Sequence, residues 1–183
     1  MRVPVIGPKG DRLMPTKPSR ARRWIKQGLA VGKFDKKLGI FYVQLLKSPS
    51  GYATQTIAVG LDPGKHFTGM AVQSKNCTLL MLHLYLPFKT ITERMSQRRM
   101  MRRTRRGRRI NRKLPFSQRA HRQKRFNNRR QSKLPPSIRA NKNLEYQILE
   151  RLQCLYPVTD IVVEVIKASG NKGFSPVMQG QSQ

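Results

Sequence analysis

Acidic side chains are scarce in this chain. Eight Asp and Glu stand against 38 Lys and Arg among 183 residues, which gives a formal net charge of +30. This balance is far from that of an ordinary cytosolic enzyme, and it draws the protein to any polyanion at low salt. Hydrophobic residues make up 38% of the chain, which is low for a globular domain but too high for complete disorder. We therefore expect a modest core beside strongly basic segments.

Cysteines and long apolar runs are also scarce. Cys77 and Cys154 lie far apart without a CxxC spacing, so we expect reduced, half-buried thiols and no zinc site. Residues 1–10 lack the apolar segment of a signal peptide, and the most apolar stretch, 79–88, is too short to span a bilayer. These absences favour a soluble, cytoplasmic protein, with association with the bacterial nucleoid as a further option.

Arginine is abundant, and it is concentrated in the middle of the chain. Residues 94–113 contain ten Arg and one Lys with no acidic residue among them. Like charges one turn apart repel on an isolated helix, whereas the planar fork of donors on Arg matches phosphate oxygens. We predict a helix over 91–113 whose partner is nucleic acid.

Further basic residues extend this predicted surface. A second stretch, 119–133, has Phe116 and Phe126 near or within it and no acidic residue, and a short N-terminal helix presents arginines to solvent or phosphate. The residues predicted to bind nucleic acid are Arg20, Arg22, Arg23, Arg94, Arg98, Arg99, Arg102, Arg103, Arg105, Arg106, Arg108, Arg109, Arg112, Lys113, Arg119, Arg122, Lys124, Arg125, Arg129 and Arg130.

The other segments predict an α/β (α+β) fold that begins with a small N-terminal domain. A helix is expected over 20–27, with Thr16 or Ser19 as N-cap, Gly28 as its stop and Trp24 and Ile25 on its buried side. Two short strands follow at 29–34 and 39–45. The expected divisions of the whole chain are 1–54, 55–88, 89–133, 134–168 and an irregular tail, 169–183.

Residues 55–88 contain three apolar runs separated by turn residues, which predicts an antiparallel meander. Its strands are expected at 56–61, 68–72 and 78–84, with Asp62-Pro-Gly64 as the first turn. Residues 138–155 have the spacing of an amphipathic helix, with Ser137 as N-cap and Leu144, Ile148, Leu152 and Leu155 on one face. The β-branched run 158–166 predicts a last strand.

Two of the few carboxylates occupy informative positions. Asp62 ends an apolar strand, and Glu164 lies inside the run Ile161-Val-Val-Glu-Val-Ile166. A buried carboxylate needs a partner, a proton or a metal, so side by side the two could hold Mg²⁺. The simpler alternatives are a turn-forming role for Asp62 and a solvent-facing position for Glu164. His66 and His83 are better explained as surface or packing residues, and His121 in the basic stretch as one that contacts phosphate or solvent.

Four passages stand in a recognisable order. Val3-Pro-Val5 with Leu13-Met-Pro15 and Arg20-Ala-Arg-Arg-Trp24 come first, and Ile57-Ala-Val-Gly-Leu-Asp-Pro-Gly64 follows. Arg98-Arg-Met-Met-Arg-Arg-Thr-Arg-Arg106 is the third, and Asp160-Ile-Val-Val-Glu164, with Gly173-Phe-Ser-Pro-Val-Met178 just beyond it, is the fourth. Together they resemble the IscB/IsrB family of transposon-encoded RNA-guided nucleases: a PLMP domain, then a RuvC-like RNase H fold split by an arginine-rich bridge helix of the RRXRR type.

The resemblance implies a Mg²⁺-dependent endonuclease in which Asp62 and Glu164 are catalytic metal ligands of a two-metal site. It implies guide RNA and the RNA–DNA heteroduplex or target DNA as partners, with no small-molecule substrate, and leaves the oligomeric state open. Arg12 stands where the PLMP tetrad has its first proline. The HNH domain and third RuvC segment of the family do not follow, so we expect a truncated copy or fragment that cleaves little or nothing alone.

Two other functions agree with the composition. A plain basic RNA-binding protein, for instance one associated with the ribosome, would use the carboxylates only structurally and would show no preference among RNAs. A cationic membrane-active segment is less favoured, because the arginine run lacks a continuous apolar face.

Overall fold

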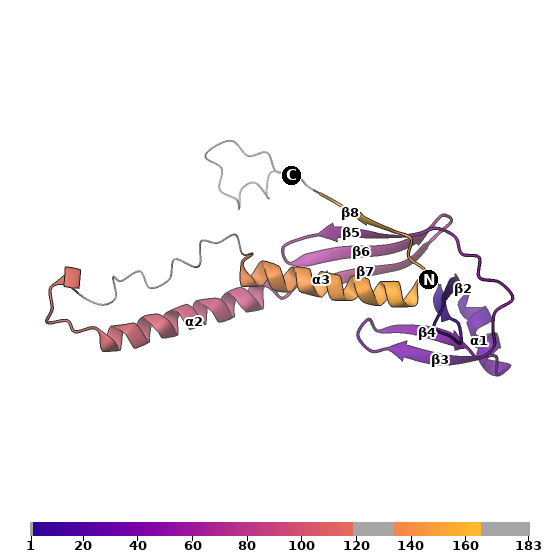
Figure 1. The fold of residues 1–183 in the computed structure, drawn as a ribbon, viewed down its shortest axis with the longest axis horizontal. Helices are drawn as coiled ribbons and strands as arrows, with labels where there is room; N and C mark the ends of the chain where they lie inside the picture. The colour runs from indigo at the N-terminus through magenta and orange to yellow at the C-terminus, as the bar shows by residue number, and fades with distance from the viewer. Residues whose placement is uncertain (1, 119–133, 166–183) are drawn as a thin grey trace.

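A computed structural model describes residues 2–118 and 134–165, which form two four-stranded mixed sheets, three α-helices and a short 3-10 helix, Phe116–Gln118 (Figure 1). The mixed α/β class expected from the sequence is therefore confirmed. The expected division into segments stays a prediction. Elements of the first sheet are β1 (Val3–Ile6), β2 (Arg12–Thr16), β3 (Ala30–Asp35) and β4 (Ile40–Leu45), and those of the second are β5 (Ile57–Pro63), β6 (Phe67–Ser74), β7 (Thr78–Tyr85) and β8 (Asp160–Val163).

The N-terminal sheet has the order β2-β1-β4-β3, with β1 parallel to β4. Only β3 and β4 were expected from the sequence. β1 and β2 were missed because each is short and contains a proline, Pro4 or Pro15, which cannot donate to a sheet ladder and argues against a strand. Long-range pairing with β4 makes β1 a strand.

Helix α1 (Pro18–Lys26) covers this sheet and ends before Gly28, whose φ of 67° is the left-handed conformation of a helix stop. The expected stop is thus confirmed. The expected N-cap is wrong, because Lys17 occupies that position and no side chain caps the helix. The buried residue of α1 is Ala21, whereas Ile25 is 38% exposed, since only a narrow stripe of so short a helix reaches the sheet.

The second sheet has the order β7-β6-β5-β8. The first three strands form the antiparallel meander that the sequence predicts, and β8 pairs in parallel with β5. Helix α3 (Pro136–Leu155) packs on one face of the sheet, where Leu152 and Leu155 meet Ile57 and Val59. It begins two residues before the expected start, and Pro135 rather than Ser137 is its N-cap.

The two sheets contribute to one hydrophobic core that also includes α3. Ile40 of β4 is buried in the same cluster as the residues of β5 and α3, and Leu38 and Met14 pack against it. Tyr156, just after α3, is 1% exposed, and burial raises the pKa of its phenol to about 12. Deprotonating this tyrosine therefore costs more than deprotonating an exposed one.

Helix α2 (Phe88–Arg109) projects away from the sheets (Figure 1). Its 22 residues extend over about 33 Å at a rise of ~1.5 Å per residue. The expected helix is confirmed, but its end is four residues earlier than predicted, because Ile110 is extended. In the described part of the chain, no helix combines the length and the apolar character needed to cross a membrane.

The connection between β5 and β6 is tighter than the sequence indicated. Asp62 and Pro63 belong to β5 rather than to the turn. A Cβ on Gly64 would overlap the carbonyl oxygen of Phe67. A glycine is therefore required beside Asp62 because the backbone comes too close for any side chain.

We predict that Gly64→Ala lowers the free energy of unfolding by about 1–3 kcal/mol, because the new methyl group meets backbone that cannot move aside. The matched control is Gly51→Ala, at an exposed position where an added Cβ has nothing within 4 Å. Urea denaturation of both variants checks this. Equal stability of the two variants would contradict the tight turn.

Candidate nucleic-acid interface and carboxylate pair

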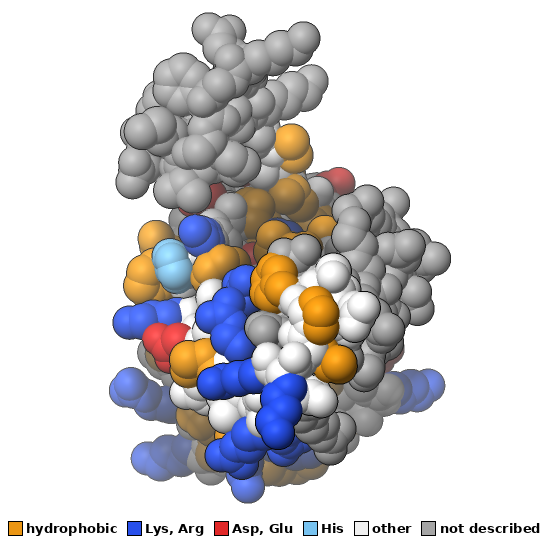
Figure 2. Space-filling model, turned by 90° about the vertical axis from the view of Figure 1, so that its left-hand side faces the viewer, with side chains coloured by type: hydrophobic (Ala, Val, Ile, Leu, Met, Phe, Trp, Pro, Cys, Tyr) orange, Lys and Arg blue, Asp and Glu red, His pale blue; other side chains and the backbone are white. Residues whose placement is uncertain are grey.

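The basic surface of the molecule is α2. Every side chain from Thr92 to Arg105 is exposed, and no ion pair forms among those side chains of α2 that the structure describes. Figure 2 looks at the molecule from the α2 end and shows Lys and Arg side chains spread over it with few acidic ones among them. The positive charge of this helix is therefore not compensated within the helix.

The structure places the predicted nucleic-acid-binding residues in several groups. Those with exposed side chains on α2 are Arg94, Arg98, Arg99, Arg102, Arg103, Arg105 and Arg108, and the side chains of Arg106 and Arg109 lie outside the description. Arg112 and Lys113 are exposed just beyond α2. Outside the described residues are Arg119, Arg122, Lys124, Arg125, Arg129, Arg130 and His121.

The arginines of α1 form a separate group. Arg20, Arg22 and Arg23 are exposed, but α1 lies at the opposite end of the molecule from the tip of α2 (Figure 1). The structure thus does not bring the two basic helices together into one surface.

The two predicted metal-binding carboxylates are neighbours. In the parallel pairing of β5 with β8, Leu61 lies opposite Val163. The next residues, Asp62 and Glu164, continue this register, because the Glu164 N–H donates to the Leu61 carbonyl at 2.9 Å. Partners in a parallel ladder point to the same side of a sheet, so both carboxylates belong to one face.

That face is the one opposite α3. Ile57 and Val59 alternate with Asp62 along β5 and are fully buried under the helix. A Cβ on Gly69, opposite Asp62 on β6, would lie 3.8 Å from the Asp62 Cβ. Gly60, Gly69 and Ala71 on the same face of β5 and β6 have no large side chains, so the sheet surface beside Asp62 is not covered by them.

Glu164 is not buried. Every residue of β8 is exposed, and Glu164 just beyond it is exposed as well. The burial argument for a metal at Glu164 therefore fails, and Glu164 has the solvent exposure of the simpler alternative. Proximity to Asp62, rather than burial, remains the argument for a shared ligand.

Sequence reasoning missed a buried carboxylate, Glu145 of α3, which is 4% exposed. The Thr68 hydroxyl on β6 donates to its Oε1 at 2.7 Å, and Lys142 Nζ lies 2.9 Å from its Oε2. The same hydroxyl accepts the Gly64 N–H at 3.4 Å. Glu145 thus links α3 to the turn that follows Asp62.

Asn141, one turn earlier on α3, adds a second link. Its Nδ2 donates to the Lys65 carbonyl at 3.0 Å, and its Oδ1 is buried without a partner in the described structure. The signal was present in the sequence: Asn141 and Glu145 precede Ile148 and Leu152 at helical spacing on the apolar stripe. Polar residues at such positions need specific partners.

The remaining candidates are at the surface. His66 and His83 are exposed, as expected. Both cysteines are free; Cys77 is half-buried as expected, whereas Cys154 is exposed. Among the residues that the structure describes, no three His, Cys, Asp or Glu side chains gather in a way that could hold a metal ion.

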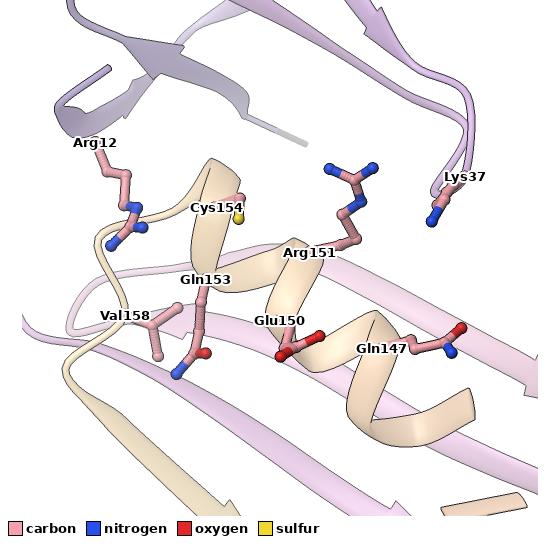
Figure 3. A pocket seen from close by; sticks show the side chains of 8 residues that line it. All are labelled: Arg12, Lys37, Gln147, Glu150, Arg151, Gln153, Cys154 and Val158. Atoms are coloured by element: carbon pink, nitrogen blue, oxygen red, sulfur yellow. The ribbon is translucent and has the colours of Figure 1, made fainter. Parts of the chain in front are cut away.

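A cleft of about 570 Å³ lies between α3 and the N-terminal sheet (Figure 3). Arg12 of β2, Lys37 of the β3–β4 turn and Arg151 of α3 contribute cations, and Glu150 contributes a carboxylate. Arg12 is exposed. The cleft lies toward the other end of α3 from Asn141, so it is separate from the carboxylate pair.

These features define a strongly basic α/β protein with a projecting arginine helix and a bare sheet face. The model of a protein family described as RRXRR protein matches residues 3–181, and the chain belongs to this family. Membership suggests a role in nucleic-acid binding. A search of curated proteins finds no match.

We predict that replacing Arg98, Arg102 and Arg105 by Gln weakens RNA binding and reduces the slope of log K against log salt by about 2–3, because each lost phosphate contact removes ~0.7–0.9. The control replaces the exposed Lys9, Lys47 and Lys75 by Gln, with the same change in net charge. Fluorescence anisotropy from low to high salt checks this. Equal losses in the two variants would show that only total charge matters.

We also predict that Thr68→Val lowers the free energy of unfolding by about 1–3 kcal/mol, because buried Glu145 loses its hydroxyl donor. Thr78→Val, at an exposed site on the neighbouring strand, should stay within about 0.5 kcal/mol of the parent. Thermal denaturation distinguishes the two variants. An unaffected Thr68→Val protein would mean that this hydrogen bond contributes nothing to stability.

Proposed function

We propose that this chain binds guide RNA and the guide–target heteroduplex as part of an RNA-guided nuclease of the IscB/IsrB type, with Asp62 and Glu164 as two of its Mg²⁺ ligands. The observation that carries the proposal is the parallel β5–β8 pairing. It brings Asp62 next to Glu164, although the two residues are 102 positions apart in the sequence. The segment between these strands contains the arginine helix of an RRXRR family member.

The sheet supports the finer fold assignment. An antiparallel meander, then a helix packed on one face, then a strand parallel to the first is the arrangement expected of an RNase H-like sheet. The order β7-β6-β5-β8 with α3 agrees with it. β5 and β8 are parallel neighbours, so their carboxyl-terminal ends lie at the same end of the sheet. Asp62, near the end of β5, and Glu164, just after β8, are therefore close together there.

The start of α2 supports a link between the basic helix and the carboxylates. Phe88 makes an edge-to-face contact with His66 at 5.4 Å, and Lys65 Nζ lies 5.0 Å from the centre of the same ring. Lys65 and His66 belong to the connection that follows Asp62. Nucleic acid bound along α2 would therefore run toward the carboxylate pair.

The two carboxylates fit part of a Mg²⁺ shell, because this ion prefers oxygen ligands and shares its coordination with water and phosphate. When bound, Mg²⁺ would activate water and stabilise the departing oxygen in phosphodiester hydrolysis. Asp62 and Glu164 would hold the ion at the bare face, and the arginines of α2 would orient the phosphates. Two ligands bind the ion weakly, so we expect little or no cleavage by this chain alone.

We predict a weak Mg²⁺ site, of roughly millimolar affinity, that is lost in both Asp62→Asn and Glu164→Gln. Without metal, each change should raise the unfolding free energy by about 0.2–1 kcal/mol, because like charges on neighbouring strands repel. Glu93→Gln, at an exposed carboxylate of α2, should leave the Mg²⁺ affinity unchanged and should not raise the unfolding free energy. Calorimetric titration and thermal denaturation in EDTA measure both effects.

The full test adds the cognate guide RNA and its matched DNA. Tighter binding of the guide than of random RNA of equal length supports the proposal; equal binding, insensitive to Mg²⁺, would instead favour a non-catalytic basic RNA-binding protein. Guide-dependent nicking that Asp62→Ala abolishes would contradict the expected inactivity of the chain alone.

A further inference from the structure

We propose that Phe67, His83 and Tyr85 form a stacking platform for a base of single-stranded nucleic acid beside the carboxylate pair. This inference rests on the proposed function, because it places that nucleotide next to the phosphate the carboxylates would face. The platform lies on the sheet face opposite α3, the same face as Asp62 and Glu164.

The strand register puts these side chains in adjacent rows. Asp62 lies opposite Gly69, and Gly69 lies opposite His83, so the row across the sheet runs from Glu164 through Asp62 and a bare glycine to His83. Neighbouring strands are about 4.8 Å apart, so His83 lies on the order of 10 Å from Asp62 with no side chain between them. Phe67 and Tyr85 face each other in the next row.

The three rings already contact one another. His83 is stacked on Phe67 with ring centres 4.9 Å apart and planes 19° apart, and Tyr85 meets Phe67 edge-on at 5.4 Å. Phe67 is 48% exposed and Tyr85 63%. Packed rings with this much free surface can accept a further flat ring without rearrangement.

Exposure alone does not make a binding site. Phe34 and Phe41 also face each other across two strands of the N-terminal sheet and are 59% and 43% exposed. Such a pair is explained by cross-strand stabilisation of the sheet. The rings around Phe67 differ in their neighbours: a carboxylate pair lies across the glycine, and the arginine helix begins at Phe88, three residues after Tyr85.

The positive charge near the platform indicates which ligand stacks on it. Bases stack on exposed aromatic side chains, while the phosphates that accompany them need cations close by. Lys65 and the arginines of α2 supply positive charge at this end of the sheet. The bases of a duplex are already stacked on one another, so the platform accepts an unpaired strand. Its role is to position that strand and does not include chemistry.

The test uses the full chain, EDTA, and single-stranded oligonucleotides with 2-aminopurine at one position. We expect binding to quench the fluorescence of 2-aminopurine, and Phe67→Leu and Tyr85→Leu each to weaken binding about tenfold, because each removes an aromatic surface on which a base stacks. Oligonucleotides that are wholly abasic should bind all variants equally. Phe34→Leu is the matched control and should bind like the parent chain, and thermal denaturation verifies that every variant is folded.

Three outcomes would overturn the platform: equal losses for intact and abasic strands, an effect of Phe34→Leu as large as that of Tyr85→Leu, or a dimer dissociated by Tyr85→Leu with unchanged oligonucleotide binding. EDTA and the absence of a guide separate this result from the proposed function. If the chain prefers the guide RNA but shows no base stacking, only the platform is wrong. If it shows base stacking but does not prefer the guide RNA, only the guide-RNA assignment is wrong.

Discussion

The parallel pairing of β8 with β5 is the contact on which the candidate site depends. Thr159 sets its register at the start, because its N–H donates to the Ile57 carbonyl at 2.9 Å and its hydroxyl accepts the Ile57 N–H at 3.2 Å. A slip of one residue would turn Glu164 to the opposite face of the sheet from Asp62. The fully exposed β8 has little burial to resist such a slip, so these two hydrogen bonds carry much of the specificity.

A second constraint is the repulsion among the arginines. α2 places nearly all of them away from the core. Its first turn contacts the β5–β6 connection through Phe88, and the helix also contacts α3. This arrangement keeps the cations hydrated when no partner is bound. It also offers phosphate a long, uncompensated surface, so binding nucleic acid relieves a repulsion that folding leaves in place.

Buried polar contacts connect these two parts. Glu145 and Asn141 hold the segment from Gly64 to Thr68 against α3, and that segment follows Asp62 and contains Phe67 of the ring cluster. A buried carboxylate that is fully hydrogen-bonded costs little, but one without partners is expensive. The position of the loop beside the carboxylates is therefore coupled to the packing of α3.

The sequence by itself determined the meander, the amphipathic α3, the existence of α2 and the position of Asp62 at a strand end, because hydrophobic period and charge runs are local signals. It placed Glu164 inside a strand over 158–166, whereas β8 ends at Val163. It did not predict β1 and β2, the exposure of Ile25 and Cys154, or the burial of Glu145, which depend on what packs against each segment. Only the tertiary structure decided that Asp62 and Glu164 share a row with Gly69 and His83. Register between strands so distant in sequence follows from pairing and burial in three dimensions, and no local pattern encodes it.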